Sequence, residues 1–203
     1  MAVPDHSIDP KILSSAKEEF LTKGYVDVSL REVCKKAGVT TGALYNRFKG
    51  KEALFAALIE PTLQALESIS ESMENYNYEY LEKNEVQKMW DMSESRLVGI
   101  IEFFYEHYDG LRLLLCCSEG STYSNFLDDF VSKNTKQTMK FIDATMEKGV
   151  TSERIDEEEL HMLLTAYWAT LLEPIVHDFP KEKALLHSKM VAKFFNWQAV
   201  LGF

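Results

Sequence analysis

The most constraining feature of the sequence is a short amphipathic segment that begins at a hydroxyl residue and stops at a glycine. From Leu30 to Ala37, apolar residues recur at i, i+3, i+4 and i+7, which predicts a short helix. Ser29 and Glu32 form a Ser-x-x-Glu capping box at its start. Gly38 is suited to end it, so we expect a tight turn there.

A second short helix is expected directly after this turn. Thr40 can cap it, and Leu44 and Phe48, four residues apart, give it an inward face. The positions left pointing outward are Thr41, Gly42, Tyr45 and Asn46.

Longer helices are predicted on both sides of this pair. Asp9 as N-cap and Pro10 in the first turn open one of them, and Gly24 is placed to stop it. After a break at Gly50, a long helix starts at Lys51. Two short helices joined by a glycine-bearing turn, with a longer helix on each side, are the arrangement of a DNA-reading helix-turn-helix.

The charge distribution supports a nucleic-acid partner although the net charge does not. The chain carries a net charge of −10, which by itself disfavours such a partner. From Arg31 to Lys51, however, six Lys or Arg residues face one Glu, a local charge of +5. Exposed charges farther away than about 8 Å are largely screened at physiological salt, so a locally basic face can still bind phosphate. The acidic remainder should suppress non-specific DNA binding.

The remainder of the chain also reads as helix. Only 9 Gly and 5 Pro interrupt 203 residues, and β-branched runs are scarce, so we predict an all-α protein. Breaks are expected near Pro61, 75–84, Asp109-Gly110, 119–124, 149–156 and 177–180, and helical spacing marks the segments 85–108, 111–117, 124–148, 157–176 and 181–201.

The sequence predicts a cytoplasmic protein without a membrane span. The N-terminus lacks the pattern of a signal peptide, and no window approaches about 18 uninterrupted apolar residues. The three cysteines, Cys34, Cys116 and Cys117, have no disulfide-framework spacing and fit a reducing cytosol. Buried thiols are the simpler interpretation of the adjacent Cys116 and Cys117, and a redox sensor is the alternative.

Residues 29–60 read SLREVCKKAGVTTGALYNRFKGKEALFAALIE and strongly resemble the head of TetR-family regulators. The shared pattern is a hydroxyl cap, a short helix ending Ala-Gly-Val, then Thr-Thr-Gly, Leu-Tyr-x-x-Phe and Lys-x-x-Leu. The similarity covers about residues 9–60, and the remainder shows no subfamily pattern. It implies a transcriptional regulator that binds DNA sequence-specifically, with a family bias towards repressors that a small-molecule effector releases from a palindromic operator.

The resemblance also implies which residues meet DNA. Small residues at the start of the second short helix let the backbone approach bases and phosphates. Tyr45 can donate to a phosphate, Lys51 at a helix N-terminus can bind one, and Arg31 can pair with guanine. The expected contacts are Ser29, Arg31, Thr40, Thr41, Gly42, Ala43, Tyr45, Asn46, Arg47 and Lys51.

Each of the main residues expected to contact DNA could instead have an ordinary structural role. Tyr45 could be a half-buried core tyrosine, and Lys51 an ordinary solvated lysine. Arg31 could form a surface salt bridge with Glu32 or Asp27.

The resemblance implies a homodimer, because one such head reads only a few base pairs. In the family, the last two long helices usually form the interface, which here would be 157–176 and 181–201. The second of these is unusually apolar for a terminal helix. Packing against its own body could also bury that surface.

The expected organisation is thus a head over residues 1–52 and an effector-binding and dimerisation body over 53–203. The middle of the chain is rich in aromatic residues with polar groups among them, as ligand pockets are, although an ordinary aromatic core uses the same residues. The effector is unknown, and a hydrophobic or aromatic molecule is expected. The candidate ligand-binding residues are Phe104, His107, Tyr108, Arg112, Tyr123, Tyr167 and Trp168.

The sequence disfavours two other functional classes. An enzyme is disfavoured because His-Glu-x-x-His, a phosphate-cradling glycine loop and Gly-x-Ser-x-Gly are all absent. The five histidines show no tight metal spacing, so neither a metal site nor a cofactor is expected. A protein-interaction module that has lost DNA binding is disfavoured because the outward residues of the second short helix remain small, polar or basic.

Overall fold

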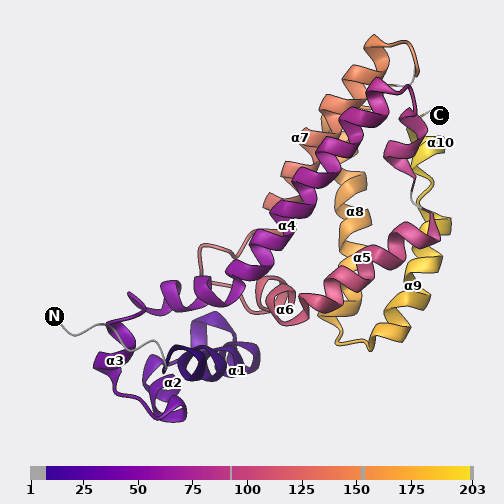
Figure 1. Cartoon of the computed structure of the whole chain (residues 1–203). Helices are drawn as coiled ribbons and strands as arrows, with labels where there is room; N and C mark the ends of the chain where they lie inside the picture. Colours follow the sequence, from indigo (N-terminus) through magenta and orange to yellow (C-terminus); the bar gives the residue numbers. More distant parts are fainter. Residues whose placement is uncertain (1–7, 92, 152–153, 202–203) are drawn as a thin grey trace. The chain divides into compact units, whose positions relative to one another are not determined.

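The computed structural model describes residues 8–91, 93–151 and 154–201, and the regular structure within these ranges is all helical, as predicted. The helices are α1 (Asp9–Asp27), α2 (Leu30–Ala37), α3 (Thr41–Tyr45), α4 (Lys51–Glu82), the 3-10 helix η2 (Val86–Trp90), α5 (Glu94–Glu106), α6 (Tyr108–Cys116), α7 (Phe126–Glu147), α8 (Glu157–Val176), α9 (Lys181–Phe194) and α10 (Trp197–Leu201) (Figure 1).

The chain forms two compact units. The head unit comprises the described residues up to Ala65 together with Tyr108–Asn125, and the body unit comprises Leu66–His107 and the described residues from Phe126 onward. Helix α4 is continuous and contributes its first part to one unit and its second part to the other. The head unit is therefore larger than residues 1–52, because it takes in the start of α4 and all of α6.

The head unit is held together by the apolar stripes that the helical spacing predicted. The side chain of Phe20 from α1 is fully buried, and its ring meets the ring of Phe55 from α4 edge-on at 5.0 Å between centroids. Val33 from α2 and Leu44 from α3 are also fully buried. Each such burial contributes about 1.5–3 kcal/mol, which fixes the two short helices against the longer ones.

The helix ends of the head agree with the sequence pattern at three places. The helical path of α1 breaks at Gly24, with φ 74° and ψ 167°, although the assigned helix runs on to Asp27. Gly38 ends α2 in the left-handed region at φ 68°, a conformation that suits glycine. The hydroxyl oxygen of Thr40 accepts a hydrogen bond of 3.1 Å from the backbone N–H of Ala43, as expected of a cap.

Two expected caps are not formed. The N-cap of α1 is Ile8, and Asp9 already lies within the helix. The side chain of Ser29 makes no capping hydrogen bond, so the predicted capping box with Glu32 is wrong. Instead, the carbonyl oxygen of Ser29 accepts the first helical hydrogen bonds from Glu32 and Val33.

The predicted break at Pro61 is also wrong, because α4 continues through it. Proline removes one hydrogen bond to the carbonyl four residues earlier, here that of Ala57. Pro61 is exposed, so water can replace that bond. The break expected at Asp109-Gly110 occurs instead at His107, and the segment 181–201 is interrupted after Phe194.

The body unit is a layered helical bundle in which α7 packs along α8, and α9 contacts both α5 and α8 (Figure 1). Helix α8 has the predicted bounds, and the carboxylate of Asp156 caps it by accepting from the backbone N–H of Glu159 at 2.8 Å. Leu160, Leu171 and Ile175 bury the inner side of α8. No helix in the described ranges is both long and apolar enough to cross a bilayer.

Candidate nucleic-acid interface and ligand cavity

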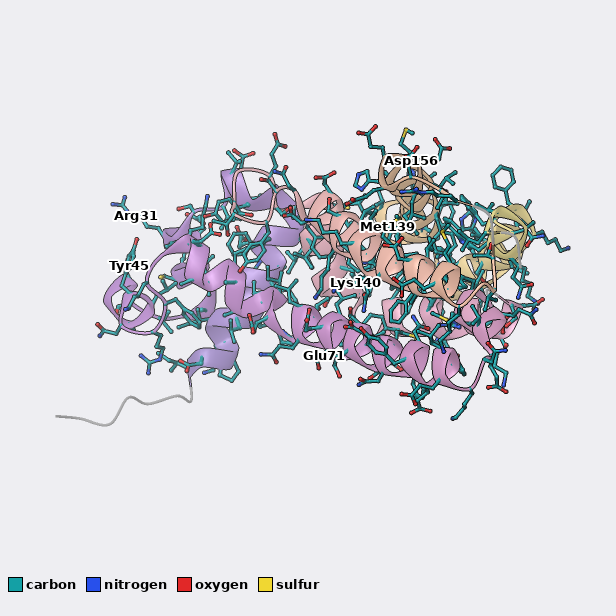
Figure 2. All side chains as sticks on the ribbon, turned by 90° about the horizontal axis from the view of Figure 1, so that it is seen from above. Arg31, Tyr45, Glu71, Met139, Lys140 and Asp156 are labelled. Carbon is teal, nitrogen blue, oxygen red and sulfur yellow. The ribbon has the colours of Figure 1, made fainter. Side chains whose placement is uncertain are left out.

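Helix α3 presents one buried and one exposed side. Leu44 is fully buried, while Tyr45 is 53% exposed and is therefore not a core tyrosine. Figure 2 shows Arg31 and Tyr45 projecting outward from the ribbon of the head unit. We call five exposed residues the reading face: Arg31 at the start of α2, Thr41, Gly42 and Tyr45 on α3, and Asn46 at the C-cap of α3.

Arg31 is the free cation of this face. Its guanidinium forms no ion pair with any carboxylate of a described residue, so the alternative of a salt bridge with Glu32 or Asp27 is not realised. Lys36 on the same helix is by contrast held by Glu18 and Glu19, and the hydrogen bond to Glu18 raises its pKa. A free guanidinium keeps all its donors available for a base edge or a phosphate.

Two other predicted DNA contacts flank the reading face. Ser29 is exposed and its hydroxyl makes no cap bond, which leaves its O–H available to a phosphate. The oxygen of Thr40 accepts from the backbone N–H of Ala43, so Thr40 orders the first turn of α3 while its own O–H can still donate.

Arg47 is placed differently from what the sequence indicated. Its side chain is only 12% exposed, and its Nε lies 2.5 Å from Oδ1 of Asp9. Its Nη1 also donates to the carbonyl of Ala43 at 3.3 Å. These contacts join the end of α3 to the start of α1, which favours a positioning role over a direct DNA contact.

Lys51 at the start of α4 is not an ordinary solvated lysine. Its ammonium donates to the carbonyls of Val26 at 2.8 Å and Val28 at 3.1 Å, and lies 4.7 Å from the ring centroid of Tyr25. It therefore fixes the connection between α1 and α2 against α4. An ammonium has three donors, so one remains for a phosphate at this helix N-terminus.

A hydrogen-bond network around the carboxylate of Glu52, which the sequence did not reveal, lies beside Lys51. The hydroxyl of Tyr25 donates to Glu52 at 2.5 Å, and the backbone N–H and hydroxyl of Thr122 donate to the other carboxylate oxygen at 3.1 and 2.5 Å. Burial raises the pKa of Glu52, but the hydrogen bonds from Thr122 and Tyr25 outweigh it, so the net shift is downward. Burial and the bond to Glu52 raise the pKa of Tyr25 to about 12.

The cysteines follow the expectation only in part. Cys34 and Cys117 are buried, and burial raises the pKa of the Cys117 thiol, which disfavours the reactive thiolate. Cys116 is exposed, contrary to the expectation of a buried thiol.

The body unit contains a cavity of about 510 Å³ that is partly open to solvent. Of the candidate ligand residues, Phe104, Tyr167 and Trp168 line it. His107 is not among its lining residues, and Tyr108, Arg112 and Tyr123 belong to the head unit. The sequence missed the cavity residues of α4 and α5, among them Ile69, Met73, Asn77 and Arg96.

An apolar stripe on α8 and α9 is open to solvent in the isolated chain. It consists of Met162 on α8 and of Leu186, Met190 and Phe194 on α9, the last of which is 83% exposed. The three residues of α9 are four positions apart and thus share one side of the helix. Packing among the described residues leaves these four side chains exposed.

Comparison with known proteins agrees with this geometry. Residues 12–58 match the family model of bacterial regulatory proteins of the tetR family. YdgC, an uncharacterised helix-turn-helix transcriptional regulator of Bacillus subtilis, is 36% identical over 63 residues, 31% of this chain and 32% of that protein. UidR, a helix-turn-helix transcriptional regulator of Escherichia coli, is 33% identical over 69 residues, 34% of this chain and 35% of that protein. The matched stretches thus span about a third of each relative's length.

Structural similarity to solved proteins extends beyond the head. A Clostridium perfringens protein described as a candidate fatty acid metabolism regulator superposes with a TM-score of 0.60 at 20% identity, over 91% of this chain and 98% of that chain. At that identity the likeness concerns the fold alone. Residues 12–58 are thus similar to the head of bacterial regulatory proteins of the tetR family, and over the rest of the chain the similarity is one of fold.

Proposed function

We propose that the protein is a transcriptional regulator whose α3 enters the major groove of DNA. The observation that carries the proposal is the reading face: a short helix with its apolar side buried and small, polar and phenolic side chains exposed, next to the unpaired Arg31. A helix of this kind fits the major groove, where a guanidinium can pair with guanine and a threonine methyl can contact thymine.

We further propose that two copies act together through the apolar stripe of α8 and α9. Met190 and Phe194 are 71% and 83% exposed, a large apolar surface that a second copy would bury. A twofold dimer presents two heads to successive major grooves, about 34–36 Å apart, and so requires a palindromic operator.

Release by an effector is the third part of the proposal and makes the protein a repressor. Helix α4 carries Leu54 and Phe55 in the core of the head unit and Met73 and Asn77 in the wall of the cavity. A ligand that fits one arrangement of the cavity wall shifts the population of α4 towards that arrangement. The coupling need only be about 1–3 kcal/mol to change operator affinity 5- to 150-fold.

The test begins with selection of binding sites from random DNA by the purified full chain. Affinities for the selected site are then compared for the wild type, Arg31→Gln and Lys140→Gln. Lys140 is an exposed cation of the body unit and is the matched control, because its replacement removes the same charge (Figure 2).

We expect Arg31→Gln to weaken binding by about 1–3 kcal/mol, the value of one good base contact, and Lys140→Gln to leave it unchanged. Equal losses in the two variants would refute the assigned reading face. Failure to recover any site would favour a protein-interaction module instead.

A further inference from the structure

The wall of the body-unit cavity is mostly apolar and carries one cation. Aromatic and aliphatic side chains from α4, α5, α7 and α8 form most of its wall, including Ile69, Phe103, Phe141 and Trp168. Among the described residues that line it, Arg96 alone is charged. A cavity of about 510 Å³ lies within the range that holds small organic molecules.

The guanidinium of Arg96 is poorly satisfied. Nη1 donates to the carbonyl of Lys88 at 3.1 Å, and Nη2 donates to the sulfur of Met73 at 3.2 Å. No carboxylate of a described residue pairs with it. A thioether is a weak acceptor, so the Nη2 donor is available to a stronger one. A half-buried cation without a counter-charge is costly, and an anion bound beside it removes that cost.

Neutral polar atoms without partners belong to the same wall. The side-chain oxygen of Asn77 and the indole N–H groups of Trp168 and Trp197 are buried and have no hydrogen-bond partner. All three residues line the cavity. A buried donor left unsatisfied costs about 1–3 kcal/mol, so ligand oxygens that accept from the indoles would stabilise the bound state.

We propose that the cavity binds an organic anion with an apolar body. The carboxylate of this ligand pairs with the guanidinium of Arg96, and its hydrocarbon part packs against the aromatic wall. This proposal deepens the effector site of the proposed function and rests on it. A guanidinium binds a carboxylate through two parallel hydrogen bonds, and the surrounding apolar wall strengthens that attraction. A cationic ligand would meet Arg96 without any compensating carboxylate in the described wall.

The test uses three probes that share a decyl chain and differ in charge: decanoate, 1-decanol and decylamine at neutral pH. All three tryptophans of the chain, Trp90, Trp168 and Trp197, line the cavity, so intrinsic tryptophan fluorescence reports binding to the full chain without DNA. Calorimetric titration confirms the affinities. We expect decanoate to bind at least about tenfold more tightly than decanol, since a charge-assisted hydrogen bond is worth about 1.5–3 kcal/mol and 1.4 kcal/mol is tenfold. Decylamine should bind most weakly.

Variants distinguish the contribution of the Arg96 cation to ligand affinity from that of the apolar wall. Arg96→Met should weaken decanoate binding about 10- to 100-fold and leave decanol binding nearly unchanged, while Arg96→Lys should retain part of the preference for decanoate. Lys88→Gln is the matched control, because Lys88 carries a neighbouring exposed charge that is not part of the cavity wall. Thermal melting of each variant shows that it is folded.

Equal affinities of the wild type for decanoate and decanol, no decanoate binding at millimolar concentration, or an unchanged affinity in Arg96→Met would each overturn the proposal. The readout is independent of DNA. A chain that prefers decanoate but selects no operator refutes the proposed function alone, whereas operator binding without anion preference refutes this inference alone.

Discussion

Replacing Gly110 by alanine tests how closely α4 and α6 pack in the head unit. An alanine Cβ at this position would lie 1.9 Å from the hydroxyl oxygen of Thr62 and 2.8 Å from its Cβ. Rotation of the Thr62 side chain moves the hydroxyl but leaves the second contact too short. Thr62 is buried, so the two helices must separate. Overpacking of this kind costs about 1–3 kcal/mol.

The expected change in stability for Gly110→Ala is opposite in sign to the usual effect of replacing glycine by alanine in a helix. Glycine to alanine inside a helix normally stabilises it by up to about 1 kcal/mol. Gly99 in α5 is the matched control, because an alanine Cβ there meets no atom within 4 Å. We predict that Gly99→Ala leaves the melting temperature unchanged or raises it. Gly110→Ala should lower it by about 2–12 °C, since 1 kcal/mol corresponds to about 2–4 °C in a chain of this length.

A double-mutant cycle ties the effect to Thr62. Thr62→Ala removes the hydroxyl and methyl groups, so Gly110→Ala should cost less in that background than in the wild type, with a coupling of about 0.5–3 kcal/mol. The readout is the free energy of unfolding from denaturant titration followed by circular dichroism. A Gly110→Ala variant as stable as Gly99→Ala, or additive losses in the cycle, would refute the close packing.

Three further predictions concern the reading face, the carboxylate network and the apolar stripe. Gly42→Ala adds a methyl whose nearest neighbour, the hydroxyl oxygen of Thr40, is 4.0 Å away, so melting should show no loss of stability. Fluorescence anisotropy should nevertheless show at least about tenfold weaker operator binding, or about 1.4 kcal/mol, and unchanged affinity would exclude close backbone approach. Because the pKa of Glu52 is lowered in the folded state, its stabilising effect is present above the ordinary value of 4.5 and is lost as the pH falls through the folded pKa. Denaturant titrations should therefore show that Glu52→Gln is less stable than the wild type at pH 7, and that the difference in free energy of unfolding shrinks below pH 4.5. A difference that does not change with pH would exclude this link between the pKa of Glu52 and stability. Sedimentation should show Phe194→Glu shifted towards monomer while Tyr76→Glu, an exposed aromatic of α4, sediments as the wild type does. Equal behaviour of the two variants would exclude the stripe as the interface.

The head could be predicted from the sequence because its determinants are local. Gly38 and Thr40 bound the two short helices, and the spacing of Leu30, Val33 and Leu44 sets their inward sides. These signals act over a few residues and are therefore readable in the linear sequence. The interactions of Lys51 with Val26 and Val28 were missed because they join residues 23 and 25 positions apart.

The cavity could not be predicted from the sequence because its wall comes from many helices. His107 and Tyr108 lie at the junction of α5 and α6 and resemble ligand residues by type, yet neither is in the wall. Arg96, eleven residues earlier on α5, is in it. Which side of α5 faces the cavity depends on the packing of α4, α7 and α8, which no local spacing encodes.

The proposed reading face is tested most directly by the base preferences of the protein on DNA. Binding of the wild type and Arg31→Gln is measured to every single-base variant of the selected operator. We predict that Arg31→Gln loses discrimination at one position, and at its symmetry mate in the other half-site, while preferences elsewhere persist. A uniform loss over all sequences, or a change confined to one half-site, would contradict a twofold pair of heads that read bases through α2 and α3.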